Sequence, residues 1–132
     1  MNMTERQFSL FQDLLRRVQA GSSFYQKKFA DHDFCPDDVK TPDDLKKVPF
    51  STKEDLRDAY PLGIQAVPDE QIVRIHSSSG TTGKPVIIPY TQKDVDTWAE
   101  LFARCYQTAG ITNLDRIHIT PGYGLWTAGI GF

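Results

Sequence analysis

Residues 74–90 read RIHSSSGTTGKPVIIPY, in which a loop of small polar residues, 77–85, separates two short runs rich in β-branched residues. Serine, threonine and glycine are too small and too polar to build a core, so this loop has to lie at a surface between two strands. Pro89 cannot donate to a sheet ladder, which places the second strand at a sheet edge or at a bulge. The pattern therefore predicts a strand, a loop and a second strand.

Residues 91–110 carry the strongest helical pattern of the chain, with Thr91 as the cap and Gly110 as the stop. An apolar stripe at helical spacing is formed by Val95, Trp98, Leu101, Phe102, Cys105 and Ala109. Residues 115–120 then alternate between apolar and polar types, which predicts a half-buried strand. The order strand–loop–strand–helix–strand predicts an α/β architecture with helices packed on a sheet.

The preceding residues are predicted to be helical. Thr4 and Gln7 have the spacing of a capping box before an amphipathic helix that ends near residue 21. A second helix is predicted over 23–31, a third after Thr41, and a fourth that opens with a Ser51–Glu54 capping box. We therefore expect a helical N-terminal segment over 1–70 and the start of an α/β domain over 71–132.

The composition limits the classes of function. The chain has 132 residues, with 15 Lys and Arg against 17 Asp and Glu, and this balance argues against a nucleic-acid or membrane-surface binder. No apolar run approaches the roughly 20 residues that a membrane span needs. Cys35 and Cys105 lack CxxC or metal-ligand spacing and no signal peptide precedes them, so we expect reduced thiols in a cytoplasmic protein and no metal site.

The loop 77–85 has the parts of a phosphate-binding site. Gly80 and Gly83 permit positive φ and a close approach of the backbone to a ligand, the hydroxyls donate hydrogen bonds, and Lys84 adds a positive charge. It is not a Walker A motif, because Ser78 stands where glycine is required and Pro85 follows the lysine. It is not a G-x-S-x-G nucleophile elbow either. From the residues alone, phosphate binding and a plain solvated loop both remain open.

A resemblance to a known protein family favours phosphate binding over a plain solvated loop. The stretch SSSGTTGKP is similar to the phosphate-binding motif of the adenylate-forming superfamily, which contains the acyl- and aryl-CoA synthetases. Four stretches, FYQKKFAD, VPFSTKEDLRDAYPLG, RIHSSSGTTGKPVIIPYT and GYGLWTAGIGF, together resemble the N-terminal region of phenylacetate–CoA ligases. They cover almost the whole chain in the same order and spacing.

The resemblance implies a ligase that uses ATP, Mg²⁺ and coenzyme A to convert phenylacetate, or a similar aryl acid, into a thioester through an acyl adenylate. It implies a cradle for the ATP phosphates made of Ser78, Ser79, Gly80, Thr81, Thr82, Gly83 and Lys84. It also implies that Tyr123 and Trp126 border the aryl acid, although two core aromatics would give the same pattern. Pro121 and Ala128 depart from the family pattern, so the acid stays open.

The later motifs of the family, for adenine, ribose and the mobile C-terminal domain, do not occur in the 132 residues. We therefore expect an N-terminal piece of an aryl-CoA ligase that is inactive alone and contains no catalytic residue of its own. Strand edges and a helix face left uncovered by truncation predict self-association. Two alternatives remain: an adenylating synthetase for a different carboxylic acid, and a non-catalytic module that binds phosphate or a partner.

Overall fold

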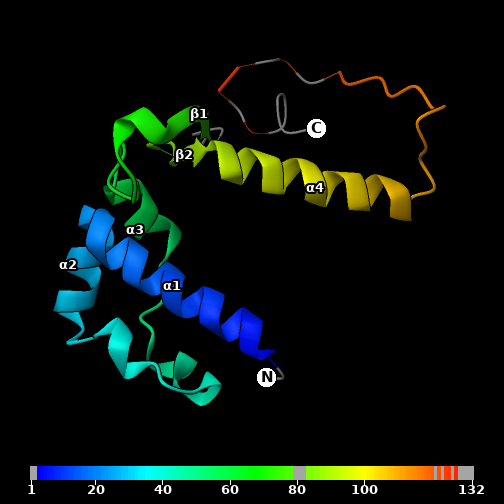
Figure 1. The fold of residues 1–132 in the computed structure, drawn as a ribbon. Helices are drawn as coiled ribbons and strands as arrows, with labels where there is room; N and C mark the ends of the chain where they lie inside the picture. The colour runs from blue at the N-terminus through cyan, green and yellow to red at the C-terminus, as the bar shows by residue number, and fades with distance from the viewer. Residues whose placement is uncertain (1–2, 79–82, 121, 123, 126, 128–132) are drawn as a thin grey trace. The chain divides into compact units, whose positions relative to one another are not determined.

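A computed structural model describes residues 3–78, 83–120, 122, 124, 125 and 127 of the chain. The chain divides into two compact units, Met1–Pro68 and Asp69–Phe132 (Figure 1). The described part of the first is helical, and the described part of the second combines strands with a long helix, so the predicted mixture of helices and strands is confirmed.

The first unit follows the predicted helical pattern closely. Thr4 and Gln7 form the expected capping box at the start of the first helix. Its elements are α1 (Glu5–Gly21), α2 (Ser23–Asp31), the 3-10 helices η1 (Pro36–Asp38) and η2 (Pro42–Lys47), and α3 (Lys53–Asp58). The segment after Thr41 is therefore helical as predicted, but it is wound as a 3-10 helix.

A small core holds these helices together. Leu15 of α1, Phe29 of α2 and Val39 of the following turn are almost inaccessible to solvent. The half-buried side chains packed around them are Phe8, Phe11, Val18, Tyr25, Phe34, Leu45 and Val48. Burying a side chain of this size contributes about 1.5–3 kcal/mol, so these contacts supply the main stabilisation of the unit.

Ser22 lies at the joint between α1 and α2 and is completely buried. Its hydroxyl donates a hydrogen bond to the carbonyl oxygen of Gly63 (2.8 Å) and accepts one from the N–H of Tyr25 (3.4 Å). The neighbouring Gly21 passes so close to Ala66 that an added Cβ would lie 2.4 Å from its carbonyl oxygen. The joint is therefore fixed against residues 63–66, and position 21 accepts only glycine.

The capping box predicted for α3 is displaced by one residue. Thr52, rather than Ser51, is the N-cap, and its hydroxyl accepts from the N–H of Asp55 while the Asp55 carboxylate accepts from the N–H of Thr52. Both registers have the same spacing in sequence. Asp55 is favoured because its carboxylate also accepts a hydrogen bond from Lys28 at 2.8 Å, a contact that Glu54 does not make.

The second unit contains η3 (Asp69–Gln71), β1 (Ile72–Ser77), β2 (Ile87–Thr91) and α4 (Gln92–Thr108). The strands pair antiparallel, from Ile72 opposite Thr91 to Ser77 opposite Ile87, with an irregularity in β1 between residues 72 and 74. Thr91 caps α4 together with Asp94, and Gly110 follows the helix with φ = 81°, as expected of a glycine stop.

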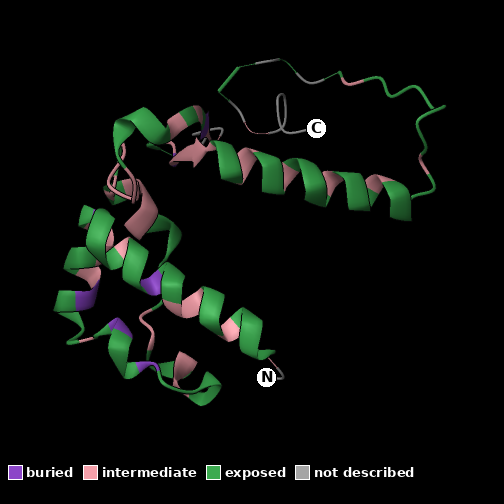
Figure 2. Ribbon diagram, in the orientation of Figure 1, coloured by how far each residue is buried: buried purple, intermediate pink, exposed green. Residues whose placement is uncertain are grey.

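Two expectations for this unit are wrong. Residues 115–120 do not form a strand: in the described residues β1 and β2 pair only with each other, so this segment has no partner ladder. Alternation alone cannot make a strand without that partner. The apolar stripe of α4 is only partly packed: Trp98 and Phe102 are half buried, whereas Leu101 and Cys105 are exposed, and exposed residues alternate with half-buried ones along α4 (Figure 2).

Within the described residues, no helix combines the length and the apolar character needed to cross a membrane.

Candidate phosphate-binding site

The β1–β2 hairpin carries the loop 77–85 at its end. Ser77 and Ile87 form the last pair of the ladder. Beyond it, the N–H of Ser78 donates to the carbonyl oxygen of Val86, and the N–H of Val86 donates to the Ser78 hydroxyl, both at 2.9 Å. These two bonds close the base of the loop and hold Ser78 at its entrance.

Gly83 and Lys84 form the other side of the loop. Gly83 has φ = 129°, a conformation that favours glycine, and an added Cβ would meet nothing within 4 Å. Lys84 is exposed, and among the described residues no carboxylate or other group pairs with its ammonium. A free ammonium beside an open glycine backbone is suited to binding an anion. The other predicted loop residues, Ser79, Gly80, Thr81 and Thr82, lie outside the described residues.

Three aromatic rings, from the two strands of the hairpin and from α4, pack against one another. His76 of β1, Tyr90 of β2 and Trp98 of α4 have mutual ring-centroid distances of 5.0, 5.2 and 5.3 Å. His76 is 1% exposed, and neither ring nitrogen has a hydrogen-bond partner among the described residues. Burial, and then the nearby charge of Arg74, lower the pKa of His76, which keeps the ring neutral.

Tyr90 belongs to the same cluster. Burial, and secondarily the carboxylate of Asp94, raise the pKa of the Tyr90 phenol, so this ring is neutral as well. This aromatic cluster was not predicted from the sequence. Period-2 alternation in the strands and helical spacing after Thr91 place the three rings on inward faces, and that signal was available in the sequence.

The second predicted segment approaches the first. The N–H of Ser77 donates to the carbonyl oxygen of Leu125 at 2.6 Å, which brings Leu125 to the end of β1 where the loop begins. Tyr123 and Trp126, predicted to border the acid, lie outside the described residues. Ser77 and Leu125 are 48 residues apart in the sequence, and no local sequence pattern predicted that they would be in contact.

The described residues contain no group of three His, Cys, Asp or Glu side chains arranged to hold a metal ion. In the sequence, no carboxylate occurs between Glu70 and Asp94, the stretch that contains the loop. The loop therefore offers hydroxyls, backbone N–H groups and one ammonium, which is a set for an anion.

Comparison of the sequence with known proteins identifies close relatives, although no family model matches. The chain is 47% identical to the phenylacetate-coenzyme A ligase of Pseudomonas putida, 49% to that of Escherichia coli (strain K12) and 51% to that of Aromatoleum evansii. Each alignment covers 117 residues, 89% of this chain and 27% of the relative. The chain thus spans about a quarter of the length of the curated relatives that it matches.

Solved structures agree with the sequence comparison. Two structures of 2-hydroxyisobutyryl-CoA ligase match 94% of this chain and 27% of their own. One is in a postadenylation state with 2-HIB-AMP (TM-score 0.81, 25% identity), the other in a thioesterification state with 2-HIB-AMP and CoA (TM-score 0.82, 27% identity). The expected resemblance is confirmed: this chain is an N-terminal portion similar to phenylacetate–CoA ligases, with the fold of that part of an adenylate-forming ligase.

Proposed function

We propose that the chain supplies the phosphate-binding part of an ATP-dependent aryl-acid–CoA ligase, with phenylacetate or a similar aryl acid as substrate. The observation that carries the proposal is the hairpin loop closed by Ser78, with Gly83 open and the Lys84 ammonium without an ion pair to any described residue. The identity of 47–51% to three phenylacetate-coenzyme A ligases supports it. Because the chain spans about a quarter of those ligases, the activity belongs to a longer protein.

The chemistry has two steps. An oxygen of the substrate carboxylate attacks the α-phosphorus of ATP, the bond from that phosphorus to the bridging oxygen breaks, and pyrophosphate leaves. The thiolate of coenzyme A then attacks the carbonyl carbon of the acyl adenylate, and AMP leaves with the electron pair of the broken C–O bond. Negative charge grows on the leaving pyrophosphate in the first step, so donors placed there lower the barrier.

The loop residues take the role of those donors. In the proposal, Ser78 and the loop hydroxyls donate to phosphate oxygens, the backbone at Gly83 approaches them, and Lys84 balances their charge. Opposite charges 4 Å apart attract by about 4 kcal/mol at an effective dielectric constant of 20, which is enough to matter for the barrier. The full cradle is Ser78, Ser79, Gly80, Thr81, Thr82, Gly83 and Lys84. Mg²⁺ would enter with the phosphates, since the loop itself has no carboxylate ligand.

Tyr123 and Trp126 would border the aryl acid. Leu125 lies between them in sequence and accepts a hydrogen bond from Ser77, which supports a position of this segment next to the loop. The proposal further places residues 1–70 in a helical segment and 71–132 in the start of the nucleotide-binding domain, in a cytoplasmic protein. The compact units on either side of residue 68 support that division. The 132 residues alone would have no ligase activity.

A chimera tests the proposal. The matching quarter of the Escherichia coli (strain K12) ligase is replaced by this chain, and phenylacetate-dependent exchange between ATP and pyrophosphate is measured. We expect exchange, and we expect Lys84→Ala to slow it by about 10²-fold, because one charged donor to the leaving group is lost. Lys93→Ala removes an equally exposed lysine from α4 and should leave the rate unchanged.

Two results would overturn the assignment. If the Lys84→Ala and Lys93→Ala chimeras exchange pyrophosphate at the same rate, the loop does not hold the phosphates. If a folded chimera adenylates only a different acid, the chain belongs to a synthetase for that acid.

A further inference from the structure

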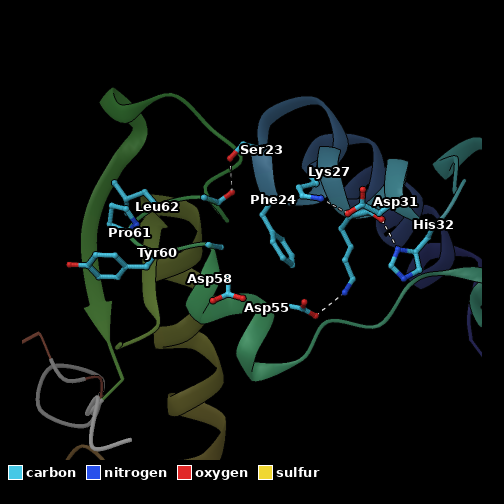
Figure 3. Close-up of a pocket in the computed structure, with 13 residues that line it drawn as sticks. Ser23, Phe24, Lys27, Asp31, His32, Asp55, Asp58, Tyr60, Pro61 and Leu62 are labelled. Atoms are coloured by element: carbon cyan, nitrogen blue, oxygen red, sulfur yellow. Dashed lines mark hydrogen bonds and ion pairs between the residues drawn. The ribbon is translucent and has the colours of Figure 1, made fainter. Parts of the chain in front are cut away.

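A pocket in the first unit lies far in sequence from the phosphate-binding loop (Figure 3). It has a volume of about 960 Å³, at the upper end of the 300–1,000 Å³ typical of small-molecule sites. One wall comes from α2, with Phe24, Lys27 and Lys28, and the other from the end of α3 and the residues after it, with Asp58 and Tyr60. Apolar atoms make up most of its surface.

The charges of the pocket do not balance. Two lysines, Lys27 and Lys28, face three aspartates. Lys27 pairs with Asp31 at 2.6 Å and Lys28 pairs with Asp55 at 2.8 Å. Both lysine ammonium groups are therefore paired. The carboxylate of Asp58, an exposed residue at the edge of the pocket, has no ion pair or hydrogen bond among the described residues, so it is available to pair with a cationic ligand.

The position of Asp58 makes that charge unfavourable for the fold. Asp58 is the last residue of α3, where the backbone carbonyl groups already present the negative end of the helix dipole. A carboxylate at this end destabilises the helix, whereas a lysine or arginine there would stabilise it. The folded chain therefore gains nothing from this carboxylate, which is consistent with a role in binding a cation.

Aromatic side chains stand beside the free carboxylate. The N–H of Phe24 donates to the carbonyl oxygen of Gly63 at 3.1 Å, and its ring packs edge-on against Tyr25 with centroids 4.9 Å apart, so the Phe24 ring is held in place before any ligand binds. Tyr60 lines the opposite side and is half exposed. Figure 3 shows Asp58 between the Phe24 and Tyr60 side chains. Aromatic faces attract cations and also pack against apolar groups.

We propose that this pocket binds a small organic cation, a primary ammonium carried on an aromatic or apolar body. The ammonium pairs with the Asp58 carboxylate, and the body packs between the Phe24 and Tyr60 rings. Charge complementarity selects the ligand, because the exposed Asp58 carboxylate has no partner among the described residues and lies beside a largely apolar surface. The site is separate from the loop 77–85, and the proposal does not depend on the ligase assignment.

Titration of the 132-residue chain with benzylammonium, followed by amide chemical shifts, tests the site. We expect saturable shifts at residues 24 and 58–63, with a dissociation constant of about millimolar for so small a ligand. Asp58→Asn should weaken binding at least about fivefold, as expected for one exposed charge pair. This variant should fold, because Asp58 makes no hydrogen bond and its charge is unfavourable for α3.

Matched ligands distinguish the contribution of the ammonium charge to binding from that of the aromatic ring. Benzyl alcohol keeps the ring without the charge. It should bind the wild-type chain more weakly than benzylammonium does. The Asp58→Asn chain should bind benzyl alcohol and benzylammonium with equal affinity. Asp43→Asn removes an exposed carboxylate outside the pocket and should leave binding unchanged. Equal affinity of the wild-type and Asp58→Asn chains for benzylammonium, or shifts that map elsewhere on the chain, would overturn the proposal.

Discussion

The backbone N–H of Ser77 donates a hydrogen bond to the carbonyl oxygen of Leu125, at an N···O distance of 2.6 Å. Ser77 is the last residue of β1 and immediately precedes the loop, while Leu125 belongs to the glycine-rich segment expected to border the acid. One backbone bond thus connects the two halves of the proposed site.

Hydrogen exchange of the Ser77 amide checks this connection. We expect the Ser77 amide to exchange at least about tenfold more slowly in the full chain than in a chain that ends at residue 120, since the deletion removes its acceptor. The Ser78 amide donates to Val86 and should keep its protection in both chains. Equal exchange of the Ser77 amide in the two chains would show that the bond does not form in solution.

The neutral ring of His76 makes stability depend on pH. Burial lowers its pKa in the folded chain below the ordinary value of 6.5, so the unfolded chain binds more protons. The stabilisation is complete above pH 6.5 and is lost as the pH falls from 6.5 through the lower, folded-state pKa. We expect the melting temperature to fall between pH 8 and pH 5, and His76→Phe to reduce that fall.

The matched control for this prediction is His118→Phe, which replaces an exposed histidine and should leave the pH dependence as in the wild-type chain. At pH 8, His76→Phe should also be as stable as wild type or more stable by about 1 kcal/mol, because it removes buried ring nitrogens that have no hydrogen-bond partner in the described part of the chain. A pH dependence identical in the His76→Phe and wild-type chains would mean that another group is responsible.

The helices could be predicted from the sequence because their signals are local. The Thr4–Gln7 capping box and the apolar spacing that follows it act within a few residues, and α1 begins where they indicate. Residues 115–120 show the opposite case, since a strand depends on a partner that alternation does not specify. Thr52 was chosen over Ser51 as the cap of α3 through Lys28, which is distant in sequence.

One part of the candidate site was predictable from local sequence, and another part was not. The loop 77–85 is marked by its composition and by its resemblance to a known motif, and the hairpin presents it as predicted. The Ser77–Leu125 bond and the pocket around Asp58 arise from long-range contacts. Their residues have ordinary local patterns, so only the folded chain brings them together.

Ser22 makes a buried polar contribution to the stability of the first unit. Its buried hydroxyl donates a hydrogen bond to the Gly63 carbonyl and accepts one from an N–H group in the first turn of α2. We expect Ser22→Ala to lower the free energy of unfolding by about 1–2 kcal/mol, because α2 loses its N-cap and the half-buried Gly63 carbonyl loses one of its donors. Urea unfolding measures the change.

Ser23→Ala is the matched control. Ser23 is exposed, and its hydroxyl reaches the same carbonyl only at 3.4 Å, so its removal should cost less than about 0.5 kcal/mol. Equal losses in the two variants would contradict the role given to Ser22.

The exposed apolar face of β1 favours self-association of the chain. Val73 is 54% and Ile75 39% exposed, on the side of the hairpin opposite to the His76 ring. A two-stranded sheet also has free edges, which pair readily with another chain.

We expect sedimentation equilibrium to show concentration-dependent association of the 132-residue chain. The double variant Val73→Lys, Ile75→Lys should sediment as a monomer, since charges on this face oppose pairing. Leu10→Lys places one lysine on an exposed position of α1, outside the β1 face, and should leave association intact. If the double variant associates as strongly as the Leu10→Lys chain, the β1 face is not the contact surface.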